Sequence, residues 1–259
     1  MASQLIHGMA VEIEGSGSPL LCIHGLGGSS HVWTPLLGAL TGFRTIRPDL
    51  PGSARSALPP GALSIQGYVD ALIGLLDTLD IPAAHVTAHS LGTVVAQHLA
   101  VQHPSRVLSL ALFGPLVAPP EAGRTSIHAR AQLARTGPTG LQEIADATAK
   151  GAPGAETKAQ QPAVLALVRE IVMRQPAEGY AQSCEALARA ESAAIEQIRV
   201  PTLLVTGDQD GVAPAAHVAL MAARIPGSQT QVFDACGHWT PFEQPARCMH
   251  ALQTFYASF

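Results

Sequence analysis

The chain has 259 residues, of which 47% are hydrophobic and only 13% are charged, so it can bury a large core in one domain or two. The net charge of −4 and the lack of long lysine or arginine runs argue against a nucleic-acid-binding protein, which would carry a basic patch. The N-terminus has no basic stretch followed by an apolar one, and no apolar run reaches the roughly 18 residues of a membrane span. We therefore expect a cytoplasmic protein with no signal peptide and no membrane partner.

Strand-like and helix-like segments alternate through the first part of the chain. Alternating apolar and polar residues predict a half-buried strand over 8–14, and a continuous apolar run predicts a strand covered on both faces over 20–24. Apolar residues at helical spacing predict a helix over 65–79 with Ser64 as its N-cap. The other expected elements are a helix over 31–40, a strand over 44–49, a strand over 84–88, a helix over 91–102 and a strand over 107–113.

The alternation stops between about 117 and 195, where no strand-like run occurs. Proline and glycine divide this segment into helix-like pieces over 125–135, 138–149, 161–174 and 177–190. The alternation then resumes with a strand over 201–206, a helix over 214–223, a strand over 229–234 and a helix over 241–256. The pattern predicts an α/β fold with a doubly wound, mostly parallel sheet. We expect 1–116 and 196–259 to form its core, and 117–195 to form a helical cap inserted after the strand over 107–113.

Ser90 stands between an expected strand and an expected helix, in Ala88-His89-Ser90-Leu91-Gly92. Small residues two places to either side of a serine are typical of a nucleophile elbow, because strand and helix approach too closely there for large side chains. Such a pattern also occurs by chance, so its weight depends on the rest of the chain.

Polar or glycine-rich loops follow other buried strands as well. These loops hold His24 to Gly28, Asp210 and His238. Because ligands and catalytic groups of open α/β sheets lie beyond the carboxyl ends of the strands, we expect these loops to meet around Ser90.

The residue types in these loops fit nucleophilic catalysis. A serine hydroxyl needs an imidazole base, and the imidazole needs an acid that fixes its tautomer. We predict Ser90 as nucleophile, His238 as base and Asp210 as acid. Asp208 is the alternative acid, although we expect it to be a turn or capping residue. His89 adjoins the serine and is interpreted as a wall of the site rather than a base.

An oxyanion needs two donors aimed at one point. We expect them to be the backbone N–H groups of Leu26 and Leu91, and we place His24, Gly25 and Trp239 on the substrate-binding surface.

Neither a metal ion nor another cofactor is expected, because histidines and cysteines are scattered without ligand spacing. The cysteines form no C-x-x-C pair, and we expect them to be reduced and mostly buried. Cys236 lies two residues from His238, but its surroundings do not resemble those of an activated thiol.

The motifs together resemble the α/β-hydrolase superfamily across almost the whole chain outside the cap. They are His24-Gly-Leu-Gly-Gly28, Asp49-Leu-Pro-Gly52, Ala88-His-Ser-Leu-Gly92, Gly207-Asp-Gln-Asp210 and Gly237-His238 with Glu243-Gln-Pro245. The segments 176–187 and 198–204 are similar to the 3-oxoadipate enol-lactonase group. The resemblance implies the fold, a catalytic triad of Ser90, Asp210 and His238, and oxyanion donors at Leu26 and Leu91. Departures from the family pattern are Ala88, Thr93 and the segment 53–56.

The favoured function is a serine esterase or lactonase acting on a small carboxylic ester or lactone. The alternatives are a carbon–carbon bond hydrolase of ring-cleavage products, which would need cationic or amide groups in its pocket, and a non-catalytic ligand receptor. The cap offers candidate cations at Arg124, Arg130, Arg135, Arg169, Arg174 and Arg189, and the sequence does not indicate which of them face inward. It also leaves open whether the chain forms a homo-oligomer.

Overall fold

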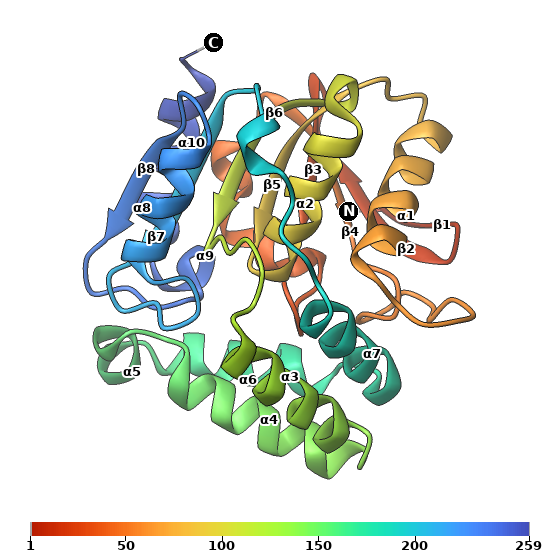
Figure 1. Ribbon diagram of the computed structural model, residues 1–259, viewed down its shortest axis with the longest axis vertical. Coiled ribbons are helices and arrows are strands. Elements are labelled where there is room, and N and C mark those ends of the chain that lie inside the picture. The colour runs from red at the N-terminus through yellow and green to blue at the C-terminus, as the bar shows by residue number, and fades with distance from the viewer. Residues whose placement is uncertain (1, 259) are drawn as a thin grey trace.

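The computed structural model describes residues 2–258, which form one eight-stranded sheet with helices on both faces (Figure 1). The strands are β1 (Ala2–Ile6), β2 (Met9–Glu14), β3 (Ser18–Ile23), β4 (Phe43–Pro48), β5 (Ala84–His89), β6 (Val107–Phe113), β7 (Thr202–Gly207) and β8 (Gln229–Phe233). Their order across the sheet is β1-β2-β4-β3-β5-β6-β7-β8. All neighbours from β4 to β8 are parallel, whereas β1 and β2 are antiparallel at one edge. The predicted doubly wound, mostly parallel sheet is confirmed.

Helices alternate with the strands, and further helices follow β6. The helices are η1 (Ser30–Ala39), α1 (Ile65–Thr78), α2 (Leu91–Gln102), η2 (Pro104–Arg106), α3 (Glu121–Ala134), α4 (Pro138–Gly151), α5 (Ala155–Gln160), α6 (Pro162–Met173), α7 (Ala177–Ala188), η3 (Ile195–Gln197), α8 (Ala215–Arg224), α9 (Thr240–Glu243) and α10 (Pro245–Tyr256). The hydroxyl of Ser64 accepts the N–H of Gly67 at 3.0 Å, so the predicted cap of α1 is confirmed. Within residues 2–258, no helix combines the length and the apolar character that crossing a membrane requires.

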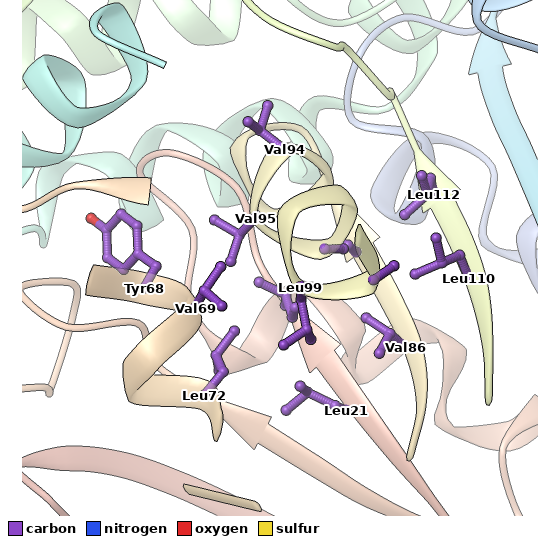
Figure 2. Close-up of a cluster of buried hydrophobic side chains, with 14 of the residues drawn as sticks. Leu21, Tyr68, Val69, Leu72, Val86, Val94, Val95, Leu99, Leu110 and Leu112 are labelled. Carbon is purple, nitrogen blue, oxygen red and sulfur yellow. The ribbon is translucent and has the colours of Figure 1, made fainter. Parts of the chain in front are cut away.

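Successive side chains of each strand point to opposite faces of the sheet, and this alternation builds two cores. On one face, Leu21, Val86 and Leu110 of three neighbouring strands pack against Val95 and Leu99 of α2 (Figure 2). A fully buried aliphatic side chain contributes roughly 1.5–3 kcal/mol. If a strand slipped by one residue against its neighbour, all its apolar side chains would move to the opposite face of the sheet. These buried side chains therefore fix the register of the sheet.

The opposite face of the sheet packs against η1 and α10. Its core includes Leu20 and Cys22 of β3, together with Trp33 of η1 and Phe255 of α10. Both faces of the central strands are therefore buried, as the continuous apolar runs of the sequence predict.

The helices α3 to α7, hereafter called the cap, lie together beyond one end of the sheet (Figure 1). They have an apolar cluster of their own, which includes Leu141, Ile144 and Val172. Leu26 and Ile127 pack against both this cluster and the sheet core. The cap therefore contacts the carboxyl ends of the strands through apolar side chains as well as through the hydrogen bonds described below.

Several local elements differ from the sequence-based expectations. The expected helix over 31–40 is a 3-10 helix with Pro35 inside it. The expected helix over 241–256 is two helices, because the ring of Pro245 interrupts helical hydrogen bonding after α9. Strand β1 and helix α5 were not expected at all.

Candidate active site

Ser90 occupies a tight turn between β5 and α2. Its φ of 51° and ψ of −122° lie in a region that non-glycine residues seldom adopt, at a cost of roughly 1–3 kcal/mol. The turn is held by the hydrogen bond from the Ser90 N–H to the carbonyl of Phe113, at 3.0 Å. A side chain at Gly92 would lie 2.6 Å from the carbonyl oxygens of Ile23 and His24, so only glycine fits there. The structure thus has the strand–turn–helix geometry that the sequence predicts around this serine.

A continuous chain of hydrogen bonds joins Ser90, His238 and Asp210. The Ser90 Oγ lies 2.8 Å from Nε2 of His238, and Nδ1 of the same ring lies 2.8 Å from Oδ2 of Asp210. These residues are only 9%, 5% and 3% exposed, respectively. The structure therefore brings together all three residues that the sequence assigned to catalysis, in a site largely shielded from water.

Asp210 is held ionised by its surroundings. Burial alone would raise the pKa of its carboxyl, but the nearby His238 ring and the N–H groups of Ala213 and Val212 outweigh burial and lower this pKa to about 2. Both N–H groups donate to Oδ1 at 2.8 Å. An ionised Asp210 keeps the proton of His238 on Nδ1, which leaves Nε2 free to accept a proton from Ser90. Asp208 points elsewhere and accepts the N–H of Cys236 at 3.1 Å, as expected of a turn residue.

The loop that carries His238 is held by a buried carboxylate, Glu243. Its oxygens accept the N–H groups of Gly237 at 3.0 Å and Trp239 at 2.9 Å, on either side of the histidine. They also accept the N–H of Gly154 at 2.7 Å and the hydroxyl of Thr157 at 2.9 Å, both from the cap. The sequence motif contained Glu243 but gave it no role. The one signal available was a carboxylate placed shortly after the histidine, in an otherwise uncharged stretch.

A glycine-rich loop, residues 24–28, lies beside Ser90. The carbonyl of Gly25 accepts the N–H of Gly28 at 3.0 Å and a hydrogen bond from Nδ1 of His24 at 2.8 Å. The C=O and N–H of a trans peptide point in opposite directions, so these bonds turn the N–H of Leu26 the other way. A side chain on Gly25 would lie 2.8 Å from the Ser90 Cβ, so glycine is required for this close approach.

The second expected oxyanion donor, the N–H of Leu91, belongs to the first residue of α2. Backbone N–H groups in the first turn of a helix have no intrahelical acceptor and remain available to a ligand. One expected donor thus lies on the glycine-rich loop and the other at the start of α2, and both adjoin the serine.

The side chains expected on the substrate-binding surface are tightly packed. Nε2 of His24 accepts the N–H of Leu50 at 2.8 Å, and burial lowers the pKa of this ring. Because both nitrogens of His24 bind backbone groups, this ring orients the loop. Trp239 is stacked on Phe242, with their ring centroids 5.7 Å apart. His89 donates from Nε2 to the carbonyl of His238 at 2.9 Å. Burial lowers the pKa of His89 to about 3, so its ring is a neutral wall of the site, as expected.

Gly114 is a further residue that the sequence did not single out. It follows β6 with a φ of +56°, and a side chain there would lie 2.9 Å from Cε1 of His238. The histidine ring therefore packs directly on bare backbone.

Among residues 2–258, no group of three or more His, Cys, Asp or Glu side chains is arranged to hold a metal ion. The four cysteines are free and buried, as expected. Burial raises the pKa of the Cys236 thiol well above its ordinary value, which makes it a poor nucleophile.

Residues 20–251 match the model of the Alpha/beta hydrolase family. The chain is 32% identical over 214 residues to 3-oxoadipate enol-lactonase 2 of Acinetobacter baylyi, covering 82% of this chain and 78% of that protein. It is 29% identical over 255 residues to 2-hydroxymuconate semialdehyde hydrolase of Pseudomonas putida, covering 94% and 89%. Its fold superposes on a thermophilic esterase from Thermogutta terrifontis with a TM-score of 0.90 at 27% identity, covering 96% and 93%. The expected resemblance to the hydrolase superfamily and the enol-lactonases is confirmed.

Proposed function

Because this chain belongs to the alpha/beta hydrolase family, we propose that it is a serine hydrolase that cleaves a small carboxylic ester or lactone. The observation that carries the proposal is the hydrogen-bonded chain from Asp210 through His238 to Ser90. Such a chain turns a weak alcohol nucleophile into a reactive one and has no need of a cofactor.

The reaction begins when the Ser90 oxygen attacks the acyl carbon while Nε2 of His238 takes the hydroxyl proton. Asp210 stabilises the resulting imidazolium. The oxygen of the tetrahedral intermediate receives hydrogen bonds from the backbone N–H groups of Leu26 and Leu91, and losing one such donor typically costs about 10²–10³ in kcat. His238 then gives its proton to the departing alcohol oxygen as the carbon–oxygen bond breaks. In a lactone, that alcohol stays attached to the acyl chain.

Water completes the cycle by the same route. His238 takes a proton from the water as it attacks the acyl-enzyme, and returns this proton to Ser90 as the carboxylic acid leaves. Neutral His89 and His24 cannot compete for these protons near pH 7, because burial lowers the pKa of both rings.

A carbon–carbon bond hydrolase is the second candidate, favoured by the similarity to 2-hydroxymuconate semialdehyde hydrolase. A dienol carboxylate substrate would require a cation in the pocket. The cap arginines already have protein partners: Arg124 donates to backbone carbonyls, Arg135, Arg169, Arg174 and Arg189 pair with carboxylates, and Arg130 contacts the hydroxyl of Tyr180. Four of these charges are thus paired with carboxylates, which favours an ester or lactone with few charges, whereas Arg130, beside Tyr180, is the cap cation to test first for binding a carboxylate-bearing substrate.

The test compares hydrolysis of p-nitrophenyl acetate with cleavage of a coloured ring-fission product, in wild type and Ser90→Ala. We expect ester hydrolysis by the wild type and a loss on the order of 10⁶ in kcat in the variant, as for nucleophile removal in subtilisin. The fold should persist, because the hydroxyl makes no packing contact that alanine lacks. Activity of Ser90→Ala within tenfold of wild type would refute the proposal. Faster cleavage of the ring-fission product would favour the second candidate. Tight ligand binding without turnover would indicate a receptor.

A further inference from the structure

The cap reaches the glycine-rich loop through one buried side chain, Gln175, which lies between α6 and α7 and is 5% exposed. Its Nε2 donates to the carbonyl oxygens of Gly27 at 3.2 Å and Gly28 at 3.1 Å, and to that of Ile171 in α6 at 2.9 Å. Its Oε1 accepts the N–H of Ala54 at 3.0 Å. Both ends of this amide are therefore occupied, and the donor end faces the loop beside Ser90.

The cap also packs directly on this loop. Gly27 has a φ of +72°, and a side chain there would lie 3.1 Å from both Val172 and the ring of Tyr180. Gly27 and Gly28 have no side chains to hold this end of the loop, so the cap adds contacts there to those that His24 makes at the other end.

Two planar peptides connect Gln175 to the expected oxyanion donor. The first peptide has the carbonyl of Gly27, bound by Gln175, at one end and the N–H of Gly28 at the other. That N–H donates to the carbonyl of Gly25 at 3.0 Å. The second peptide joins this carbonyl to the N–H of Leu26. The C=O and N–H of a trans peptide point in opposite directions. Fixing the direction of the Gly27 carbonyl therefore fixes the direction of the Gly28 N–H, and through it those of the Gly25 carbonyl and the Leu26 N–H.

We propose that Gln175 is a positioning residue for the oxyanion hole, acting through this relay of two peptides. The proposal rests on the proposed ester hydrolysis, because the oxyanion forms only in that reaction. The hydrogen bond that Gln175 donates to the Gly27 carbonyl orients the Leu26 N–H through the two peptides. It also polarises this N–H, since successive hydrogen bonds in a chain strengthen one another. The cap thereby contributes to transition-state stabilisation without touching the substrate.

The decisive variant is Gln175→Glu. It keeps the size of the side chain and an oxygen for Ala54, but it replaces the two N–H donors with an oxygen that faces the three carbonyl oxygens of Gly27, Gly28 and Ile171. Removing a direct oxyanion donor costs about 10²–10³ in kcat, so we expect an indirect loss of about tenfold or more. KM for p-nitrophenyl acetate should change less than about threefold. Affinity for a trifluoromethyl ketone, whose adduct with serine carries an oxyanion, should fall by the same factor as kcat.

Gln182→Glu is the matched control. Gln182 is also a cap glutamine whose Oε1 accepts a core backbone N–H, that of Leu63 at 3.2 Å, but its Nε2 donates to Glu178 within the cap. We expect this variant to keep the kcat and ketone affinity of the wild type. Gln175→Met adds no charge, so it separates loss of the relay from charge repulsion, although it removes the acceptor for Ala54 together with the donor.

The outcomes are distinguishable. Loss of kcat and ketone affinity in both Gln175 variants, with KM retained, supports the relay. The relay is overturned if the Gln175 variants fold and keep kcat and ketone affinity within twofold of Gln182→Glu. It is also overturned if the variants show only a lower Tm, or if neither of them folds, because these results indicate a purely structural role for Gln175. A wild type that hydrolyses no ester refutes the proposed function first, and the relay with it.

Discussion

Asp208 and Asp210 stand two residues apart in one turn, yet their carboxylates have different partners. Asp210 binds the His238 ring, whereas Asp208 binds the backbone N–H of Cys236. The position of the hydrogen-bond donors, rather than the residue type, therefore favours Asp210 over Asp208 as the proposed acid.

We predict that Asp210→Asn is far more damaging than Asp208→Asn. An amide at 210 cannot stabilise the imidazolium and favours the wrong tautomer of His238; the equivalent change in trypsin costs about 10⁴ in kcat. The matched change at 208 alters only a turn, so we expect less than a tenfold loss. Steady-state kcat on p-nitrophenyl acetate measures both variants. A crippled Asp208→Asn beside an active Asp210→Asn would reverse the assignment.

His89 should make the protein sensitive to acid. Burial lowers the pKa of this ring from 6.5 to about 3, so the unfolded chain binds a proton between these values while the folded protein does not. Its contribution to stability is therefore lost progressively as pH falls from about 6.5 toward 3, by up to about 1.4 kcal/mol per pH unit.

We predict that His89→Gln flattens the fall of stability between pH 6 and pH 4, because glutamine does not titrate and keeps a donor for the His238 carbonyl. Urea unfolding of wild type and variant at pH 6, 5 and 4 measures the difference. The lowered pKa of His24 acts in the same direction in both proteins and cancels in the comparison. Parallel stability curves would show that His89 is not the titrating group.

At the scale of elements, Glu243 connects the histidine loop to the junction between α4 and α5. The same junction gives the carbonyl of Ala152 to the N–H of His238 at 2.9 Å. Four donors converge on the carboxylate of Glu243. A glutamine there would turn its own N–H₂ toward these donors, leaving at least one buried N–H without an acceptor.

We predict that Glu243→Gln lowers the free energy of unfolding by about 1–3 kcal/mol and reduces kcat, since the histidine loop loses its support. Amide exchange should quicken at Gly237 and Gly154 together, on the loop and on the cap. Glu170→Gln is the control, because Glu170 is exposed and pairs with Arg174, the residue after α6, and such surface pairs contribute about 0–1 kcal/mol. Faster exchange at only one of the two glycines would contradict the idea that Glu243 stabilises both the histidine loop and the junction between α4 and α5.

The central strands could be predicted because burial on both faces leaves a continuous apolar run. Strand β1 could not, because its described side chains from 3 to 5 are exposed and Leu5 is 75% exposed. Helix α5 is six residues long and mostly polar, so it has no apolar stripe. The 3-10 geometry of η1 depends on Pro35 and on tertiary packing rather than on periodicity. Burial thus leaves a pattern in the sequence, whereas edge pairing and short turns do not.

The same distinction applies to the site. Ser90 and Asp210 could be proposed because each follows a buried strand and belongs to a residue class with distinctive chemistry. His238 has the same distinctive chemistry, but the strand before it, β8, is a mostly exposed edge strand rather than the buried strand that the sequence led us to expect. Glu243 and Gln175 could not be assigned roles, because they act on backbone groups 89 and 148 residues away in sequence, at Gly154 and Gly27. Backbone partners carry no signature of residue type, so only the folded chain reveals them.

Considered as a whole, the molecule joins its cap to the core at both loops that flank Ser90. Gln175 binds the glycine-rich loop, and Glu243 binds the cap to the histidine loop. A substrate that reached Ser90 would therefore lie between elements that also hold the proposed catalytic groups. Making room there for a bulky acyl group would require moving the same contacts that orient them.

We therefore predict that short acyl esters or small lactones are the preferred substrates. Ser90 is only 9% exposed, and Leu26 and Ile127 pack against both the sheet core and the cap core above it. The chain is only 4% aromatic, whereas pockets for large apolar ligands are lined mainly by hydrophobic and aromatic side chains. Across p-nitrophenyl esters from acetate to palmitate, kcat/KM should be highest at the short end and fall by about tenfold or more toward the long end. A maximum with long chains, or activation at a lipid interface, would instead mean that the cap opens widely and that the protein is a lipase.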